Sequence, residues 1–218
     1  IVVWMSGIMP ASYYNLDLKL NWFNVLAQFL VDDFFIFFIH WLEHVIPELY
    51  RAAHKPHHFY TSPVLFNAFD GSLLDTFNLI AVPLFITMNL LPVLGVEVSH
   101  VDFCVFGAIY ANQFMLLHAE YRNPWDFLCE MFSIGSPADH AVHHIEFTVN
   151  YGHFFMIYDK LFGTYVSPHD VPKLCFGPDG KPPVIPSPEH EDSDESSPPR
   201  SASRRSATPR GRKSSTKH

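Results

Sequence analysis

The chain has 218 residues and a formal net charge of -8, with Phe at 21 positions and aromatic residues making up 16% of it. This length suffices for one domain and a tail, and the acidic balance argues against a nucleic-acid-binding protein. The three scattered cysteines, Cys104, Cys129 and Cys175, form no CxxC pair, so neither a disulfide framework nor a zinc ribbon is expected.

The N-terminal residues are apolar, Ile1-Val-Val-Trp-Met5, and do not start with an initiator Met. We therefore expect residues 1–21 to be the end of a truncated membrane helix followed by a luminal loop. Three longer apolar stretches follow, at 22–41, 73–94 and 101–117. Since about 20 apolar residues cross a bilayer as a helix, we expect about four spans in the intact protein.

Within the first stretch the pair Asp32-Asp33 interrupts the apolar run. A carboxylate inside a membrane is costly and usually faces a bundle interior or a functional site. The alternative, a buried helix of a soluble protein, is rarely apolar on all sides. The short link at residues 95–100 predicts that the second and third stretches form an antiparallel helical hairpin.

Three short histidine clusters stand out: His40-Trp-Leu-Glu-His44, His54-Lys-Pro-His57-His58 and His140-Ala-Val-His143-His144. In a helix, residues three and four apart share one face, so each cluster would aim its imidazoles in one direction. Neutral imidazole binds iron, zinc, copper and nickel. Eight imidazoles exceed what one tetrahedral ion can use, which indicates two metals that share a site.

The predicted topology gathers the clusters at one membrane face. The first span ends at His40, the second cluster follows it, and the hairpin crosses out and returns at His118 before the third cluster. Lys and Arg concentrate in the short loops on this face, which makes it cytosolic. The sequence thus predicts an all-α integral membrane helical bundle with a cytosolic helical cap that carries a histidine-rich dimetal site.

Beyond the last apolar pattern, Pro, Ser and charged residues dominate. We predict that residues 167–218 are a disordered tail.

These clusters and their flanks resemble the fatty acid hydroxylase and sterol desaturase superfamily. Asp33 precedes the first histidine by seven residues, and Leu49-Tyr-Arg51 leads into the second cluster as in the family's second motif. The third cluster with Asn150-Tyr-Gly152 and 158–165 is similar to its C-terminal motif. The resemblance covers residues 22–166, which it identifies as the catalytic domain, and it looks closest to sterol C5 desaturases.

The resemblance implies which histidines bind metal. His118 joins the set because the family often places a further ligand after the hairpin, and Arg122 stands where some members have another histidine. Trp41 and Tyr158 depart from the family's usual arginine and tryptophan; these departures leave the implied ligand set intact but give less ground for assigning the substrate. The implied metal ligands are His40, His44, His54, His57, His58, His118, His140, His143 and His144.

For a member of this family, the expected cofactors are two iron ions, with zinc as an ion that could replace iron in purified protein, and O2 is a co-substrate. The expected activity is hydroxylation or desaturation of a membrane lipid, a sterol or a fatty acyl or sphingoid chain, at an unactivated C–H bond during lipid biosynthesis. Cytochrome b5 and its reductase are the expected electron donors. The expected location is the endoplasmic reticulum membrane, with several spans and with the histidine site and the tail in the cytosol.

Other polar residues have two readings each. Asp33, Asp139, Asn150 and Asp159 could orient ligand imidazoles through hydrogen bonds, whereas Asp139 and Asp159 could equally cap helices. His153 could be a ligand, or it could lie at the surface or behind the ligands.

Two other functions compete with the oxidoreductase. His40-Trp-Leu-Glu43-His44 also fits the HxxEH motif, in which Glu43 would be the general base of a zinc hydrolase. That reading leaves the other two clusters without a role. The chain could instead be a non-catalytic metal-binding membrane protein, although a carrier should place its ligands along a path through the bilayer.

Overall fold

The computed structural model describes residues 7, 9–16, 19–60, 63–119 and 123–171. Throughout these ranges the regular structure is helical, apart from one isolated bridge between Ile134 and Phe155. The predicted all-α class is confirmed. Most of the predicted tail, residues 172–218, lies outside the described residues. The described chain ends with a short turn, η6 (Pro168–Asp170), and with Val171, which packs against Val142.

The longest helix is α2 (Trp22–Val45). It begins where the Asn21 side chain accepts a hydrogen bond from the amide of Phe23, a common N-terminal cap. It ends because Pro47 follows and forces Ile46 into an extended conformation. The short helix α3 (Pro47–Leu49) then turns the chain away from the axis of α2.

The second apolar stretch is helical from Leu73 to Val93 but not uniform. It consists of α4 (Leu73–Thr76), the π-helical turn η5 (Phe77–Ala81) and α5 (Val82–Val93). Pro83 stands in the first turn of α5 and cannot donate a backbone hydrogen bond. The wide turn η5 lies just before it and takes up the change in register that this proline requires.

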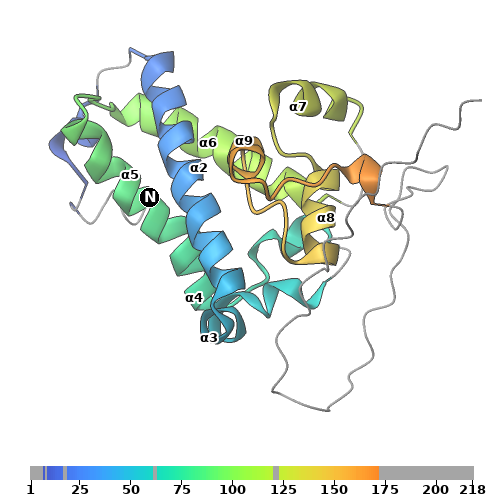
Figure 1. Ribbon diagram of the computed structural model, residues 1–218. Helices are drawn as coiled ribbons and strands as arrows, with labels where there is room; N and C mark the ends of the chain where they lie inside the picture. Colours follow the sequence, from blue (N-terminus) through green and yellow to red (C-terminus); the bar gives the residue numbers. More distant parts are fainter. Residues whose placement is uncertain (1–6, 8, 17–18, 61–62, 120–122, 172–218) are drawn as a thin grey trace, which may run out of the picture.

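The third stretch is α6 (His100–Leu117), which begins with a capping box between Ser99 and Asp102. It follows α5 after a short link, but the two helices diverge from that link (Figure 1) and each packs mainly against α2, so the predicted antiparallel pair is splayed rather than packed side by side. By length and composition, α2 and the segment Leu73–Val93 could cross a membrane. α6, expected to be a third span, is not among the helices of the described residues that meet this criterion. The total of about four spans stays a prediction.

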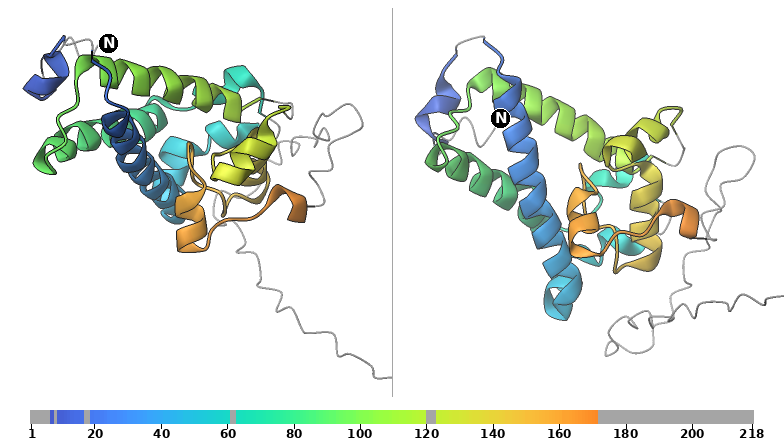
Figure 2. Two further views of the ribbon diagram at one scale, coloured as in Figure 1. Left: turned by 90° about the horizontal axis from the view of Figure 1, so that it is seen from above. Right: turned by 45° about the horizontal axis from the view of Figure 1, so that its top comes forward.

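The arrangement of these helices brings distant segments together at one end of α2. α2 packs against both α5 and α6, and Figure 1 shows α2 and α4–α5 converging beside α3. α6 passes across α2 and leads toward the smaller helices α7 (Asp126–Phe132), α8 (Pro137–Glu146) and α9 (Ile157–Phe162). In Figures 1 and 2 the turns η3 (His57–Phe59) and η4 (Leu65–Phe69) lie between the end of α2 and α8.

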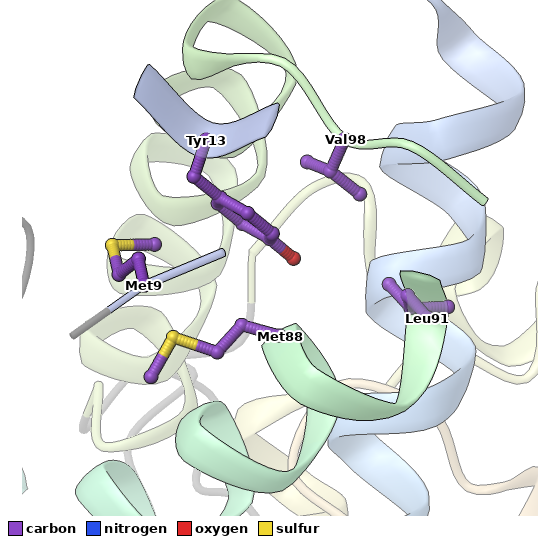
Figure 3. Packing of buried hydrophobic residues seen from close by; sticks show 5 residues of the cluster. All are labelled: Met9, Tyr13, Met88, Leu91 and Val98. Carbon is purple, nitrogen blue, oxygen red and sulfur yellow. The ribbon is translucent and has the colours of Figure 1, made fainter. Parts of the chain in front are cut away.

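Two apolar clusters stabilise this frame. Val25 and Phe29 of α2 pack with Phe106 of α6 and with Phe154, which follows α8 in the chain. At the hairpin link, the ring of Tyr13 lies between Met88 and Val98 (Figure 3), with Met9 and Leu91 in the same cluster. The apolar cluster around Phe29 therefore fixes α2 and α6 against the segment that contains Phe154, which follows the third histidine cluster.

A buried carboxylate adds a polar joint to that packing. Asp33 of α2 accepts hydrogen bonds from the backbone amides of Phe154 and Phe155, at 2.7 and 2.9 Å. Two amides of an irregular segment are thus satisfied by one side chain. Asp33 does not touch a histidine through these bonds, so its role is to hold the segment that follows Gly152.

We predict that Asp33→Ala destabilises the protein by about 2–5 kcal/mol, because two buried amides lose their acceptor. Asp33→Asn retains one acceptor oxygen and should lose roughly half as much. Thermal unfolding of the two variants in detergent measures the difference. Equal stability of Asp33→Ala and the unmodified protein would contradict this role.

Candidate metal centre

The structure brings the nine predicted histidines together in two adjacent groups. All are buried except His44, which is partly buried. Within each group, one ring nitrogen of every member lies within 4.8 Å of those of the others. The first imidazole group is His40, His44, His54, His58 and His143. The second imidazole group is His57, His118, His140 and His144.

The first cluster is helical, as predicted. His40 and His44 stand one turn apart near the C-terminal end of α2 and both enter the first imidazole group. The Nδ1 atom of His40 lies 2.7 Å from the carbonyl oxygen of Tyr151. Because a carbonyl only accepts, Nδ1 carries the proton, and the Nε2 lone pair is free to face the group.

The second cluster departs from the predicted single face. His54 ends a π-helical turn, η2 (Tyr50–His54), and His57 and His58 lie in the 3-10 turn η3. These tight and wide turns replace the regular spacing of an α-helix. As a result, His57 enters the second imidazole group while His54 and His58 enter the first.

The third cluster lies on α8, which starts with a capping box between Ser136 and Asp139 and has Pro137 in its first turn. His140 and His144, one turn apart, enter the second imidazole group, and His143 enters the first. His143 Nδ1 lies 2.8 Å from the carbonyl oxygen of Val149, which fixes its tautomer as in His40. α8 is thus the wall that the two groups share.

His118 follows the last residue of α6, where the helix ends. Its Nδ1 lies 3.0 Å from the carbonyl oxygen of Phe114, so its Nε2 also points away unprotonated. That atom is 3.0 Å from Nε2 of His140 and 3.4 Å from Nε2 of His57. The position that the resemblance assigned to a further ligand therefore lies within the second imidazole group.

The Nε2 atoms of several rings lie at hydrogen-bond distance from one another, and neutral imidazoles have too few N–H groups to satisfy all of these contacts. Nε2 of His58 lies 2.9 Å from that of His54, 3.1 Å from that of His143 and 3.2 Å from that of His44. One N–H cannot donate to three acceptors at once. Nε2 of His40 and His54 are 2.9 Å apart, although both rings hold their proton on Nδ1. A cation among these lone pairs removes the repulsion, so the donor set fits a metal in each group.

Burial makes the imidazoles ready to bind such a cation at neutral pH. Desolvation, joined by neighbouring imidazoles, lowers the pKa of His57 to about 3. It lowers the pKa of His143 to about 3 and that of His118 to about 4, although in both a hydrogen bond to a carbonyl acts in the opposite direction. The pKa values of His54, His58, His140 and His144 are also lowered by burial. Metal ligation requires this neutral form.

The carboxylates behind the imidazoles were only partly predicted. Asp75, in the second apolar stretch, lies 2.7 Å from Nδ1 of His54 and was not predicted. A buried carboxylate in an apolar helix was the signal that could have found it. Glu43 receives a hydrogen bond from Asn78 at 2.9 Å, and its other oxygen lies 3.5 Å from His54 Nδ1. Both carboxylates therefore lie on the Nδ1 edge of the ring, away from the Nε2 atoms.

The other predicted orienting residues act through the backbone. Asp159 accepts hydrogen bonds from the amides of Tyr151 and Gly152, at 2.8 and 2.7 Å, and so holds the peptide whose carbonyl faces His40. A Cβ atom on Gly152 would lie 2.4 Å from the carbonyl oxygen of Phe155, so this close approach requires glycine. Asn150, with φ of 54°, bonds to the carbonyl of Asp139 and to both backbone groups of Val166.

His153 is buried and belongs to neither imidazole group. Its ring centre is 5.1 Å from that of His40 and 6.2 Å from that of His140. Its Nδ1 lies 3.3 Å from the hydroxyl of Tyr110. It is therefore an imidazole next to both groups, not a surface residue.

Comparison with known proteins identifies a family whose model covers the residues of this site. The model of the fatty acid hydroxylase family matches residues 25–164. An alternative squalene epoxidase of Phaeodactylum tricornutum is 42% identical over 77% of this chain and 47% of its own length. Cholesterol 25-hydroxylase of Rattus norvegicus is 30% identical over 78% of this chain and 55% of its own length. A Delta(7)-sterol 5(6)-desaturase of Aspergillus fumigatus is 32% identical over 63% of this chain and 46% of its own length. The chain thus spans about half the length of these relatives. No solved structure matches it significantly.

We predict that His58→Ala and His140→Ala each reduce the metal content from about two ions per chain to about one, because each removes a central ligand of one group. His169→Ala, which changes an exposed histidine, is the matched control and should keep full metal content. Elemental analysis of protein purified with iron in the medium makes the comparison. Unchanged metal content in both site variants would contradict the assignment.

A second prediction concerns the metal-free protein. Unfolded histidines bind protons below a pH of about 6.5, whereas His57, His118 and His143 in the folded state stay neutral until pH approaches 3 to 4. The folded state therefore binds fewer protons in this window, and stability is full above pH 6.5 and falls as the pH is lowered.

Each such histidine contributes a slope of about 1.4 kcal/mol per pH unit. Thermal unfolding of chelator-treated protein in detergent measures this effect between pH 8 and pH 4, roughly the window that these pKa values set. The midpoint temperature of unfolding should fall as the pH is lowered. A midpoint that rises on acidification would refute the buried, neutral state of the imidazoles.

Proposed function

The chain belongs to the fatty acid hydroxylase family, and from that premise we propose that it is an O2-dependent di-iron oxidoreductase of membrane lipids. The observation that carries the proposal is the convergence of nine imidazoles in two adjacent groups. Two iron ions bound there would supply the activation of O2. His40, His44, His54, His58 and His143 would hold one ion, and His57, His118, His140 and His144 the other, with zinc as a substitute in purified protein.

The names of the relatives support a sterol or a sterol precursor as the substrate class. They describe one enzyme of squalene, one of cholesterol and one of a Delta(7)-sterol. Hydroxylation, epoxidation and desaturation all fit a site that places a hydrocarbon beside the two groups. The choice among them depends on how the substrate is placed to within about half an ångström.

The protein's own residues hold the imidazole rings in position and keep water out of the site. The Tyr151 and Val149 carbonyls and the Asp75 carboxylate hold the ligand rings by their Nδ1 atoms. The burial of the rings excludes water from the site. These residues hold protons on Nδ1 and leave each Nε2 free for the metal, as hydrogen-bonded partners of ligand histidines commonly do.

The proposal includes an external electron donor and a location. Insertion of one oxygen atom of O2 into a C–H bond, with the other released as water, consumes two electrons and two protons. Cytochrome b5 and its reductase would supply the electrons, as in the resembling family. We place the protein in the endoplasmic reticulum membrane, with the metal centre and the C-terminal tail in the cytosol, because Lys and Arg predominate in the short loops on that face.

The position of Glu43 argues against a zinc hydrolase. A general base must reach the water bound to the metal, but Glu43 lies behind His54, on the Nδ1 edge of the ring. His40 and His44 also belong to a group with three further imidazoles, which leaves a hydrolase motif with no reason for those ligands. A non-catalytic metal carrier is less well supported, because the nine imidazoles gather at one place and not along a path through the bilayer.

The test is O2 consumption by membranes that contain the full-length protein, with a reductant system and with squalene, cholesterol or a Delta(7)-sterol. We expect a substrate-dependent product that has gained oxygen or lost two hydrogens, identified by mass. His143→Ala should abolish the reaction, whereas Glu43→Gln should retain most of it.

Lipid profiling of cells that lack the protein, with the unmodified chain and His143→Ala as rescue arms, identifies the precursor that accumulates. Metal-loaded protein that consumes no O2 with any of these lipids would overturn the proposal. Loss of a hydrolytic activity in Glu43→Gln would favour the hydrolase instead.

A further inference from the structure

Two short helices of the predicted cytosolic cap, α7 and α9, carry apolar side chains on their outer faces. None of the residues of α7 is buried, although its sequence is largely apolar. Phe127, Met131 and Phe132 are 65%, 63% and 63% exposed, and Leu161 of α9 is 73% exposed. A helix this short is not stable by itself in water, and a helix of a soluble protein turns its apolar face inward. Something must therefore cover these faces.

The charged face of α7 is directed toward the protein. Asp126 and Glu130 are four residues apart and share one side of the helix, opposite to the exposed apolar side chains. Oδ2 of Asp126 accepts a hydrogen bond from the amide of Asn123 at 3.1 Å, and Oε1 of Glu130 lies 3.6 Å from Nε2 of His169 in η6. This orientation is the reverse of that of a surface helix in water.

α9 lies beside the middle of α2 and not beyond its end (Figure 1). The hydroxyl of Tyr158 donates to the carbonyl oxygen of Leu30 at 2.5 Å. The ring of Phe162 stacks on that of Phe37, with ring centres 5.4 Å apart. At a rise of 1.5 Å per residue, Leu30 lies about 15 Å from His40 along the helix axis, which is about half of a bilayer core. Since α2 is long and apolar enough to cross a membrane, α9 lies at the depth of the bilayer.

The end of α7 is bound to the chain that leads into α9. The carbonyl oxygen of Ser133 accepts a hydrogen bond from the amide of Met156 at 2.8 Å, and its Oγ accepts one from Nζ of Lys160 at 2.9 Å. Ile134 pairs with Phe155 in the isolated bridge. α7 is therefore held next to α9, on the side of α2 away from α3 (Figure 1).

The backbone between α8 and α9 also fits this depth. Irregular backbone inside a membrane is tolerated only where the protein satisfies its polar groups. Asp33 accepts the amides of Phe154 and Phe155, and Asp159 accepts those of Tyr151 and Gly152. Both carboxylates are buried. The segment that leads into α9 thus presents its backbone amides to the protein and leaves apolar side chains outside.

We propose that α7 and α9 are immersed in the membrane that α2 crosses and that lipid hydrocarbon covers their apolar faces. Lipid is the occupant because these faces continue the outer surface of α2, on which Leu30 and Phe38 are also exposed. A second copy of the chain would have to displace lipid from this belt. The predicted cap is therefore partly embedded. The inference depends on α2 as a membrane span and not on the chemistry of the metal centre.

Nitroxide spin labels test the depth of both helices in full-length, zinc-loaded protein in phosphatidylcholine vesicles. Labels replace Phe127 and Leu161, with Leu26 on the exposed face of α2 as the lipid reference and the exposed Glu48 of α3 as the water reference. The native cysteines are first changed to serine: Cys104, Cys129 and Cys175. The ratio of collision rates with O2 and with a polar nickel chelate should match that of Leu26. It should exceed that of Glu48 by about tenfold, because only O2 dissolves well in hydrocarbon.

Three results would overturn the inference. The first is a label at Phe127 and Leu161 that behaves like the one at Glu48. The second is shielding of both labels from both reagents together with a particle mass of two chains, which would assign the faces to a second copy. The third is a water-accessible label at Leu26, which would remove α2 as a span.

A lipid probe on the unmodified protein keeps the inference testable if the cysteine variants do not fold. A phosphatidylcholine with a diazirine on its acyl chain, activated by light in the same vesicles, should cross-link to residues 125–132 and 157–162 as well as to α2. Cross-linking to α2 with none in these two segments would refute the immersion of α7 and α9. Both outcomes leave the metal content, and so the test of the proposed function, unaffected.

Discussion

The structure depends on the mutual approach of imidazole nitrogens that carry no proton. Backbone carbonyls and one carboxylate hold the Nδ1 edges of His40, His54, His118 and His143. Nε2 of His40 therefore lies 2.9 Å from Nε2 of His54 with no hydrogen between them. Nε2 of His58 lies within 3.2 Å of three other Nε2 atoms, to which a single N–H cannot donate at once. Such an arrangement is unfavourable without a cation and strongly favourable with one. The surrounding helices hold the imidazoles in this arrangement.

The frame keeps the imidazoles in place by using polar side chains on the backbone of irregular segments. Asp33 and Asp159 each accept two amide hydrogen bonds from residues 151–155. That segment supplies the Tyr151 carbonyl for His40 and the imidazole of His153. This segment has no regular structure, but its amides have buried acceptors, as those of a helix do. The same segment lies between the metal centre and the apolar cluster of Phe29 and Phe106.

Periodicity and spacing in the sequence were enough to predict the helical class and the gathering of the three histidine clusters, whereas the predicted hairpin of α5 and α6 is splayed because both helices pack on α2. They worked because apolar stretches and i, i+3, i+4 spacing report on backbone geometry directly. They failed at the second cluster, where π-helical and 3-10 turns send His57 and His58 into different groups. Asp75 was also missed, since its partner His54 lies 21 positions away and no local pattern links them. Tertiary contacts of this kind decide which carboxylate orients which imidazole.

The most direct test of this account is a crystal or cryo-electron microscopy structure of the iron-loaded protein in lipid, with anomalous scattering recorded at the iron edge for the crystal. The account predicts two iron peaks, one among the Nε2 atoms of His40, His44, His54, His58 and His143, the other among those of His57, His118, His140 and His144. Active protein with a single peak, or with iron bound elsewhere in the chain, would contradict it.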